Sequence, residues 1–331
     1  MCDLRRHIGN PQVSKIRTGI IGLGHIGKIH ARILSETTEG QFAAVFDHHA
    51  ETAQQIAALY GIRAAATLEE FAEAVDAATV ATPTPSHFEI GKFLLERKKH
   101  LLIEKPVTEH TAQAAELVEL ARAQGCVLQV GHVERFNPVL DALGRHLTTP
   151  RFIESHRLSP YPNRSIEIGV VLDLMIHDLE IILHLVGSPV QSIDAVGMRV
   201  LSRGEDIANA RLRFENGCVA NVTVSRVSPD KVRQIRVFQP DAYISLDYQH
   251  QTGEIFRLRE GKIAGEPLEI EKGEPLKREV ESFIRCCIDG AKPRVSGHEA
   301  AAALELALEI TRRIEAQNTA SIAPMSSTSA R

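Results

Sequence analysis

Three glycines near the N-terminus have a spacing that could bind the phosphates of a nucleotide. They follow the apolar run Ile16–Ile21 and open a helical pattern that extends from Ile26 to Leu34. In such a motif the first glycine permits a tight turn, the second lets the backbone approach a pyrophosphate, and the third allows close packing of helix on strand. The N–H groups at the start of the helix would then bind the phosphates. The motif comprises Gly22, Leu23, Gly24, His25, Ile26 and Gly27.

A carboxylate follows the next expected strand. Asp47 ends the apolar run Phe42–Phe46 and lies about 20 residues beyond Gly27, where dinucleotide-binding motifs place an acidic residue. It can accept hydrogen bonds from the adenosine ribose hydroxyls and would repel a 2′-phosphate. The sequence therefore predicts NAD rather than NADP, with His48 and His49 as neighbours that could weaken this preference.

A lysine follows a third apolar run. Glu104, Lys105 and Pro106 come directly after Leu101–Ile103, and ligands of open α/β sheets gather at the carboxyl ends of strands. The proline raises the chance of a cis peptide bond. An ammonium at this place can bind a hydroxyl oxygen and stabilise the charge that develops as hydride leaves. The neighbouring run ends similarly, and its residues are expected to border the nicotinamide: Thr82, Pro83, Thr84, Pro85, Ser86 and His87.

The helical pattern Val170–Val186 carries a stripe of titratable groups. At about 100° per residue, Asp173, His177, Glu180 and His184 share one narrow face of a mostly apolar helix. His177 could accept a hydroxyl proton while Asp173, one turn earlier, orients it. A solvated surface face is the alternative. A metal is not expected, because the spacing matches no standard zinc motif and hydride transfer needs none.

The elements that must position these groups divide the chain in two. The first half alternates strand-length apolar runs with helical patterns, which predicts a parallel sheet with helices on both faces. The second half predicts an antiparallel sheet beside helices, with a hairpin at Asn216-Gly217. We expect domains at 14–133 and 134–318 and a flexible tail at 319–331. Strands are expected at 16–21, 42–46, 78–81, 101–104, 127–130, 207–214, 218–225, 232–238, 242–246 and 254–258, and helices at 26–34, 53–59, 87–95, 111–123, 170–186, 276–288 and 298–314.

Composition excludes several classes of protein. The 331 residues include 38 basic and 42 acidic side chains, a formal net charge of −4, with 44% hydrophobic residues. These values are ordinary for a globular protein and give no reason to expect a nucleic-acid surface. No apolar run approaches a membrane span, no secretory leader is evident, and the five cysteines form no CxxC pair. We therefore expect a cytoplasmic protein without nucleic-acid or membrane partners.

In this order, the motifs resemble the glucose–fructose oxidoreductase/inositol dehydrogenase/MocA family, from about Ile16 to Ala316. The resemblance implies an N-terminal Rossmann domain that binds NAD. It also implies a C-terminal α+β domain whose open, mostly antiparallel sheet assembles a homodimer or homotetramer. Lys105, Asp173 and His177 would then be the catalytic residues. The implied cofactor-binding residues are Gly22, Gly24, His25, Ile26, Gly27, Asp47, Thr82, Pro83, His87, Glu104 and Lys105.

Two departures indicate a branch of that family. Met175 and Glu180 stand where the usual pattern has Gly and Asp. Residues 131–138, 154–160 and 171–178 are similar to UDP-N-acetylglucosamine 3-dehydrogenases. Those enzymes oxidise the C3 hydroxyl of a UDP-amino sugar to a 3-keto sugar. A PLP-dependent aminotransferase can then aminate the product in amino-sugar biosynthesis, such as that of lipid A or a surface polysaccharide.

The same resemblance implies substrate-binding residues. Arg135, Asn137 and Arg157 become candidates for holding the UDP-sugar, together with Asp173 and His177. The alternatives are a structural ion pair for Arg135 and an ordinary helix start at Asn137.

The sequence leaves some roles open. His177 could take the proton while Lys105 stabilises the oxygen, or the two could exchange roles. The substrate could instead be a polyol such as an inositol, or a UDP-sugar acid whose carboxylate Arg164 or Arg157 would bind. A non-catalytic, NAD-sensing regulator on the same fold is a further alternative. The joint presence of Lys105, Asp173 and His177 argues against it, because a sensor needs none of them.

Overall fold

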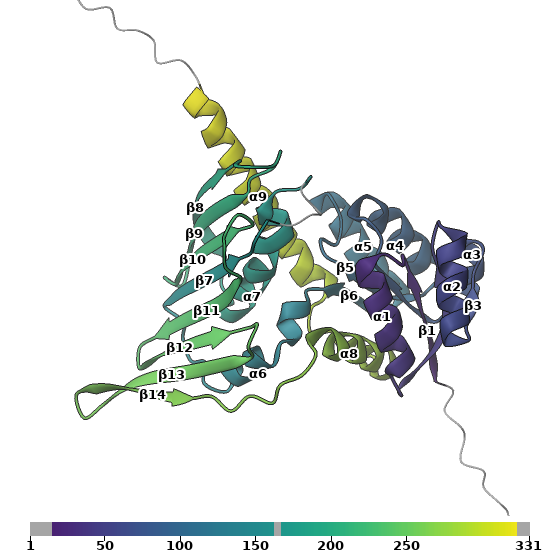
Figure 1. Ribbon diagram of the computed structural model, residues 1–331, viewed down its shortest axis with the longest axis horizontal. Coiled ribbons are helices and arrows are strands. Elements are labelled where there is room, and N and C mark those ends of the chain that lie inside the picture. The colour runs from purple at the N-terminus through teal and green to yellow at the C-terminus, as the bar shows by residue number, and fades with distance from the viewer. Residues whose placement is uncertain (1–14, 162–166, 323–331) are drawn as a thin grey trace, which may run out of the picture.

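The computed structural model describes residues 15–161 and 167–322. The expected domain start at residue 14, Arg164 and positions 323–331 of the expected tail lie outside this part of the chain. Two sheets stand side by side, and helices from both halves of the chain lie between and around them (Figure 1).

The first sheet is parallel throughout, as predicted, and has the strand order β3-β2-β1-β4-β5-β6. The strand order reverses between β1 and β4, and ligands of open α/β sheets bind at such a point. The short strand β3 and helix α3 were not expected. The elements are β1 (Ile16–Ile21), α1 (His25–Glu36), β2 (Gly40–Phe46), α2 (Ala50–Tyr60), β3 (Arg63–Ala64), α3 (Leu68–Ala74), β4 (Ala77–Val80), α4 (His87–Glu96), β5 (His100–Glu104), α5 (Thr111–Gln124) and β6 (Leu128–Gly131).

The second sheet has the order β14-β13-β12-β11-β7-β10-β9-β8 and is antiparallel except where β7 pairs with β10. The hairpin between β9 and β10 turns at Gly217, whose φ of +83° suits glycine. Strands β7, β8 and β14 were not expected. The strands are β7 (Phe152–Leu158), β8 (Val190–Met198), β9 (Ile207–Phe214), β10 (Val219–Ser225), β11 (Val232–Gln239), β12 (Ala242–Asp247), β13 (Thr252–Arg259) and β14 (Lys262–Pro267).

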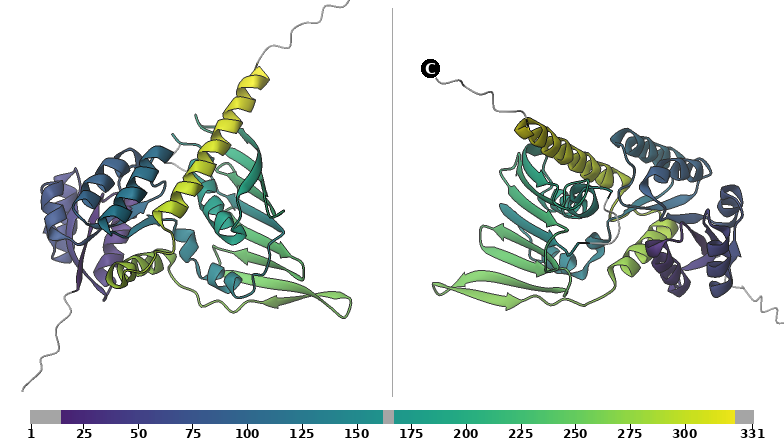
Figure 2. Two further views of the ribbon diagram at one scale, coloured as in Figure 1. Left: turned by 180° about the vertical axis from the view of Figure 1, so that it is seen from behind. Right: turned by 45° about the horizontal axis from the view of Figure 1, so that its top comes forward.

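Helices cover one face of the second sheet. They are α6 (Pro138–Gly144), α7 (Ile176–Val186) and α9 (Gly297–Ile322). In both views of Figure 2, no helix of the described chain lies over the other face. Ser296 and Glu299 cap the start of α9 reciprocally, and α9 continues beyond residue 318 to Ile322. Within the described residues, no helix combines the length and apolar character needed to cross a bilayer.

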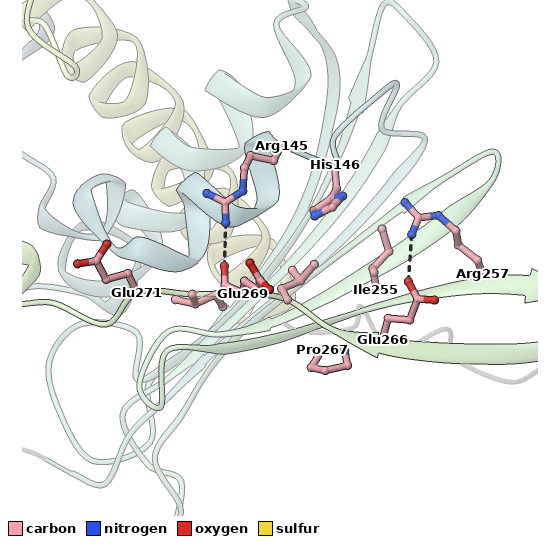
Figure 3. Close-up of a pocket in the computed structure, with 10 residues that line it drawn as sticks. Arg145, His146, Ile255, Arg257, Glu266, Pro267, Glu269 and Glu271 are labelled. Atoms are coloured by element: carbon pink, nitrogen blue, oxygen red, sulfur yellow. Dashed lines mark hydrogen bonds and ion pairs between the residues drawn. The ribbon is translucent and has the colours of Figure 1, made fainter.

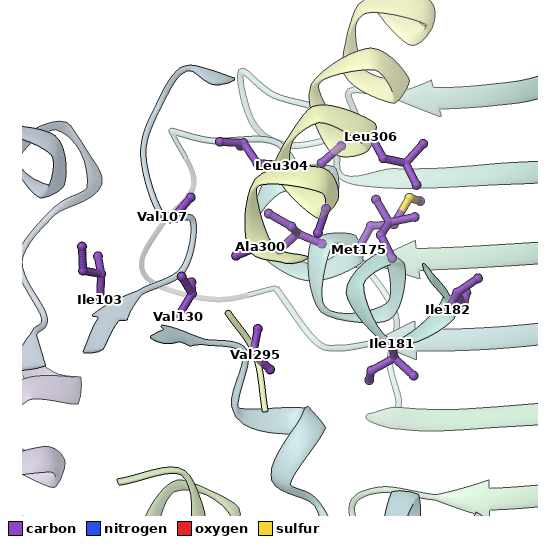
Figure 4. Packing of buried hydrophobic residues seen from close by; sticks show 14 of the residues in the cluster. Ile103, Val107, Val130, Met175, Ile181, Ile182, Val295, Ala300, Leu304 and Leu306 are labelled. Carbon is purple, nitrogen blue, oxygen red and sulfur yellow. The ribbon is translucent and has the colours of Figure 1, made fainter. Parts of the chain in front are cut away.

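The two halves share their hydrophobic core. Helix α8 (Pro275–Asp289), which the sequence assigns to the second domain, packs on the first sheet: Val280, Phe283 and Ile284 join the cluster that contains Ile20. A second cluster combines side chains of both sheets and their helices (Figure 4). Its labelled members are Ile103, Val107, Val130, Met175, Ile181, Ile182, Val295, Ala300, Leu304 and Leu306.

Candidate active site

The glycine motif forms the expected turn between β1 and α1. Gly22 has a φ of +87°, and a Cβ there would lie 2.7 Å from the carbonyl oxygen of Ala81. A Cβ on Gly27 would lie 1.9 Å from the carbonyl oxygen of Gly22, so close packing requires glycine there. A Cβ on Gly24 would meet nothing within 4 Å, which leaves its backbone accessible to a ligand. The residues therefore fit a bound dinucleotide.

Asp47 follows β2 and faces this turn. Its carboxylate accepts a hydrogen bond from the backbone N–H of Leu23 at 2.7 Å and another from that of His49 at 2.8 Å. Two further carboxylate lone pairs remain for ribose hydroxyls. His48 lies 3.2 Å from the same carboxylate, with its side chain 79% exposed.

A cavity of about 530 Å³ lies in front of the turn. Five of the predicted cofactor residues line it: Gly22, Gly24, Asp47, Thr82 and Pro83. His25 and Ile26 begin α1 and are exposed. The cavity wall beyond Thr82 and Pro83 includes Pro85 and Ser86, whose hydroxyl donates to Thr82 Oγ1 at 2.7 Å.

Two predicted cofactor residues, His87 and Glu104, point elsewhere. The His87 ring is buried and bonds the carbonyl oxygens of Thr82 at 2.8 Å and Pro106 at 2.9 Å. It fixes the two segments that border the cleft, and a cofactor contact of this side chain stays a prediction.

Glu104 instead forms part of a group between α1, β5 and α8. Its Oε1 pairs with His30 Nε2 at 2.8 Å, and ligand atoms of His30, Glu104 and the fully buried Glu279 lie within 4.8 Å of one another. The side chain of Glu104 therefore attaches the end of β5 to α1 through His30.

Lys105 extends across the junction between the two halves of the chain. Its peptide bond to Pro106 is cis. Its ammonium donates to the backbone carbonyl of Asp173 at 2.6 Å and to Asp173 Oδ1 at 3.1 Å. Both side chains are about one-fifth exposed, at 19% and 23%, so they face a partly open space. The predicted meeting of Lys105 and Asp173 is thus present.

The helix that carries Asp173 and His177 begins irregularly. The sequence predicts one α-helix from Val170 to Val186, but Val171–Met175 forms a turn of π-helix, in which the N–H of Ile176 bonds to the carbonyl of Val171. Such turns shift the register of a helix and are frequent at functional sites. Asp173 bonds Lys105, and no hydrogen bond joins it to His177 among the described contacts, so the orientation of His177 by Asp173 stays a prediction.

His177 is nevertheless close to Lys105. Burial lowers the pKa of His177 well below its usual value, and the positive charge of Lys105 lowers it further. The ring is therefore neutral near pH 7 and can accept or donate one proton. The structure thus joins Lys105, at the carboxyl end of β5, to Asp173 in the π-helical turn, and His177 follows in the first turn of α7.

The three predicted UDP-sugar residues are buried in structural contacts. Arg157 is 3% exposed and binds Asp178 at 2.7 Å and Glu134 at 3.0 Å. Asn137 is 2% exposed and donates to the carbonyl of Tyr248 at 3.0 Å.

Arg135 is likewise enclosed. Its guanidinium is 4% exposed and lies 3.2 Å from the carboxyl group of Glu180, whose pKa burial raises to about 8. In this structure Arg135 and Asn137 make the structural contacts that were their alternative roles, and Arg157 is enclosed by acidic side chains. Substrate binding by these three side chains stays a prediction.

Two residues near His177 were missed. Arg233, on β11, donates to Glu134 at 3.0 Å, and its side chain is 36% exposed on the face that the helices cover. Alternation in Val232–Phe238 would have placed it on the same face as buried Ile235. His132 follows β6, and its ring meets that of His177 edge to face, with centroids 5.7 Å apart. Nothing in its sequence context distinguishes it from a core histidine.

A second pocket lies apart from these residues. It encloses about 940 Å³ between the end of α6 and the hairpin β13–β14 (Figure 3). Its charged groups bond one another: Arg145 donates to the carbonyl of Glu269 at 2.7 Å, and Arg257 pairs with Glu266 at 4.0 Å. None of the residues predicted to do chemistry lines it.

Comparison with known proteins agrees with this geometry. Residues 16–132 match a family model described as an oxidoreductase family with an NAD-binding Rossmann fold, and residues 145–244 match the GFO/IDH/MocA C-terminal domain. The chain belongs to the GFO/IDH/MocA family of oxidoreductases. The resemblance expected from the sequence and both halves of the expected fold are confirmed.

Within this family, relatives of known activity are similar over almost the whole chain. A UDP-N-acetylglucosamine 3-dehydrogenase from Acidithiobacillus ferrooxidans is 34% identical, over 91% of this chain and 98% of its own length. A crystal structure of that enzyme superimposes with a TM-score of 0.88. A scyllo-inositol 2-dehydrogenase (NAD(+)) from Bacillus subtilis is 26% identical, over 90% of this chain and 93% of its own length. These relatives favour the enzymatic interpretation over the sensor.

Proposed function

We propose that this GFO/IDH/MocA protein oxidises the C3 hydroxyl of UDP-N-acetylglucosamine to the 3-keto sugar with NAD⁺. The observation that carries the proposal is the contact between Lys105 and Asp173, with His177 close enough for the charge of Lys105 to lower its pKa. The 34% identity to a UDP-N-acetylglucosamine 3-dehydrogenase supports this substrate, whereas the inositol dehydrogenases are less similar. Arg157, one of the two alternative arginines for the carboxylate of a UDP-sugar acid, is buried and paired with Asp178.

The cofactor would be held by the turn Gly22–Gly27 and by Asp47. When bound, NAD⁺ supplies the acceptor for the hydride that leaves C3. Backbone N–H groups at the start of α1 bind phosphate, and Asp47 accepts from the adenosine ribose hydroxyls while repelling a 2′-phosphate.

The chain's own groups handle the proton. His177 is neutral, so it can accept the proton of the C3 hydroxyl. Lys105 donates a hydrogen bond to the same oxygen and stabilises the negative charge that develops on it. Asp173 holds Lys105 in place through two hydrogen bonds. A reversal of the roles of Lys105 and His177 is disfavoured, because Lys105 is a cation paired with Asp173 and must first lose a proton to act as a base.

Arg233 is the cation we assign to the substrate diphosphate. Its side chain is more exposed than those of Arg135 and Arg157, and Glu134 fixes one of its nitrogens. The remaining guanidinium donors can form charge-assisted hydrogen bonds with phosphate oxygens. The 3-keto product would pass to a PLP-dependent aminotransferase.

The open face of the second sheet is our candidate for joining subunits into a dimer or tetramer. Four rings lie in a row on that face, at centroid distances of 5.8, 5.3 and 4.4 Å. The row is Phe152, Phe238, Tyr243 and Phe256.

The test is the appearance of NADH absorbance with NAD⁺ and UDP-N-acetylglucosamine, with an aminotransferase added to consume the product. We expect turnover with this substrate and none with free inositols. If the protein oxidises an inositol and no UDP-sugar, an inositol replaces UDP-N-acetylglucosamine as the proposed substrate. Absence of NADH with a panel of UDP-sugars and polyols would favour the non-catalytic, NAD-sensing regulator.

A further inference from the structure

The buried ring nitrogen of His177, Nδ1, has no hydrogen-bond acceptor for a proton that it would carry. Nδ1 is enclosed in protein and has no hydrogen-bond partner, whereas Nε2 is not enclosed. If Nε2 is to accept a proton from a substrate, the neutral ring must carry its own proton on Nδ1. A buried N–H without an acceptor bears the full cost of desolvation, so the ring would instead favour the tautomer with the proton on Nε2. That tautomer cannot act as the base at Nε2.

The groups around His177 narrow the choice of acceptor. Besides burial, its pKa is affected by the charges of Lys105, Arg157, His132 and Arg233. Lysine and arginine side chains only donate hydrogen bonds. Of these four groups, His132 is the one with a lone pair. Asp173, which could have accepted, is bonded to Lys105 instead.

His132 also lacks hydrogen-bond partners. Its ring is 1% exposed, and both ring nitrogens are buried without a partner. The ring lies edge to face with that of His177, with centroids 5.7 Å apart and an angle of 83° between the planes. Rotation of one ring, or a single bridging water, would connect a nitrogen of His132 to Nδ1 of His177.

We propose that His132 is a positioning residue that accepts the Nδ1 proton of His177 and so directs the Nε2 lone pair of His177 toward the substrate hydroxyl. The inference rests on the proposed function only in naming His177 as the proton acceptor. Burial, with the charges of Lys105 and Arg135, lowers the pKa of His132 to about 3. His132 therefore keeps a lone pair at neutral pH.

The deciding measurement is the tautomer of His177 in the NAD-bound protein. Histidine-selective ¹⁵N labelling distinguishes the two tautomers, and the His177 signals are those that disappear in His177→Gln. We expect the Nδ1–H tautomer in the wild type and in His132→Asn, whose amide can still accept. In His132→Phe, which retains an aromatic ring but no acceptor, we expect the Nε2–H tautomer to gain population.

Turnover provides the second readout. His132→Phe should lower kcat about 10- to 100-fold, the usual effect of losing a group that orients a functional histidine, with KM and melting temperature near wild type. His132→Asn should recover part of that loss. The matched control is His184→Phe, which makes the same substitution at another histidine of α7, the helix that carries His177. It should change neither the tautomer of His177 nor kcat.

The outcomes separate the inference from the proposed function. An unchanged His177 tautomer in His132→Phe overturns the inference even if kcat falls, because the effect on kcat would then be structural. An Nε2–H tautomer in the wild type also overturns it. If the wild type oxidises no UDP-sugar, the proposed function fails, while the tautomer measurement still decides the role of His132.

Discussion

Asp173 binds the ammonium of Lys105 twice, through its backbone carbonyl at 2.6 Å and its carboxylate at 3.1 Å. The contact joins the end of β5 to the π-helical turn that precedes α7. A lysine from one half of the chain is thus aimed by the backbone of the other half. The position of its ammonium depends on how the two halves pack, as well as on the strand that carries it.

Removal of either reacting group should abolish most turnover without loss of cofactor. We expect Lys105→Met and His177→Gln each to lower kcat about 10²- to 10⁴-fold, the usual contribution of a positioned acid or base. Binding of NAD, measured by calorimetry, should stay within about twofold, because neither side chain lines the cavity at the glycine turn. Rates close to wild type in both variants would refute these assignments.

The acid limb of the pH profile should lie below the ordinary histidine range. Because burial and the charge of Lys105 lower the pKa of His177, its neutral form persists as the pH falls through 6.5. We therefore expect kcat/KM to decline only at lower pH. Lys105→Met removes a positive charge that destabilises protonated His177. An NMR titration of that variant should therefore show a higher His177 pKa than in the wild type. A wild-type His177 that titrates at or above 6.5 would contradict this account.

Asp47 should determine the choice between NAD and NADP. In Asp47→Ser the repulsion of a 2′-phosphate is lost, and we expect the ratio of kcat/KM for NAD to that for NADP to fall at least tenfold. The KM for NAD should also rise, because Asp47 holds the N–H of Leu23 in the glycine turn. His48→Ala is the control for the adjacent exposed ring. A wild-type preference for NADP would remove this role from Asp47.

Arg157 and Arg233 should respond differently to mutation. Arg157→Met leaves the buried carboxylate of Asp178 without its guanidinium and leaves Glu134 paired with Arg233, and it should lower the free energy of unfolding by about 3–5 kcal/mol, measured with urea. Arg233→Gln should raise the KM for the UDP-sugar about tenfold or more and leave the melting temperature near wild type. The matched control is Arg236→Gln on the same strand, whose side chain is half exposed. An unchanged KM in Arg233→Gln would exclude Arg233 as the diphosphate ligand.

Assembly should depend on the open face of the second sheet. We expect light scattering to give a dimer or tetramer for the wild type and a smaller species for Tyr243→Glu, which places a charge in the row of rings. Leu59→Glu, at an exposed apolar position on α2, is the control and should keep the wild-type mass. An unchanged mass for Tyr243→Glu would show that another surface joins the subunits.

The sequence predicted those features that depend on local pattern. The glycine turn follows from spacing, because a Cβ at Gly22 or Gly27 would meet backbone atoms. Convergence of Lys105 with Asp173 followed from the rule that strand ends gather ligands, together with the family resemblance. Both are properties of short segments placed in a known topology.

The differences between the expected and the observed contacts concern side-chain direction, which sequence pattern does not determine. Glu104 lies next to Lys105 but points backward to His30, because adjacent residues at a strand end face opposite sides. Arg157 is a cation of the type that binds phosphate, yet two acidic side chains already surround it. The π-helical turn altered the angles of the helical wheel that paired Asp173 with His177.

The position of α8 has a consequence for biosynthesis. Its apolar side chains complete the core of the first sheet, and the amide of Gln129 in β6 donates to a backbone carbonyl of this same helix. A chain released after residue 133 would leave that surface in water, at a cost of about 1.5–3 kcal/mol for each large apolar side chain that α8 would have buried. We therefore expect the nucleotide-binding half to complete its core only after α8 has been synthesised, and a cut between the halves to leave the first half without these side chains.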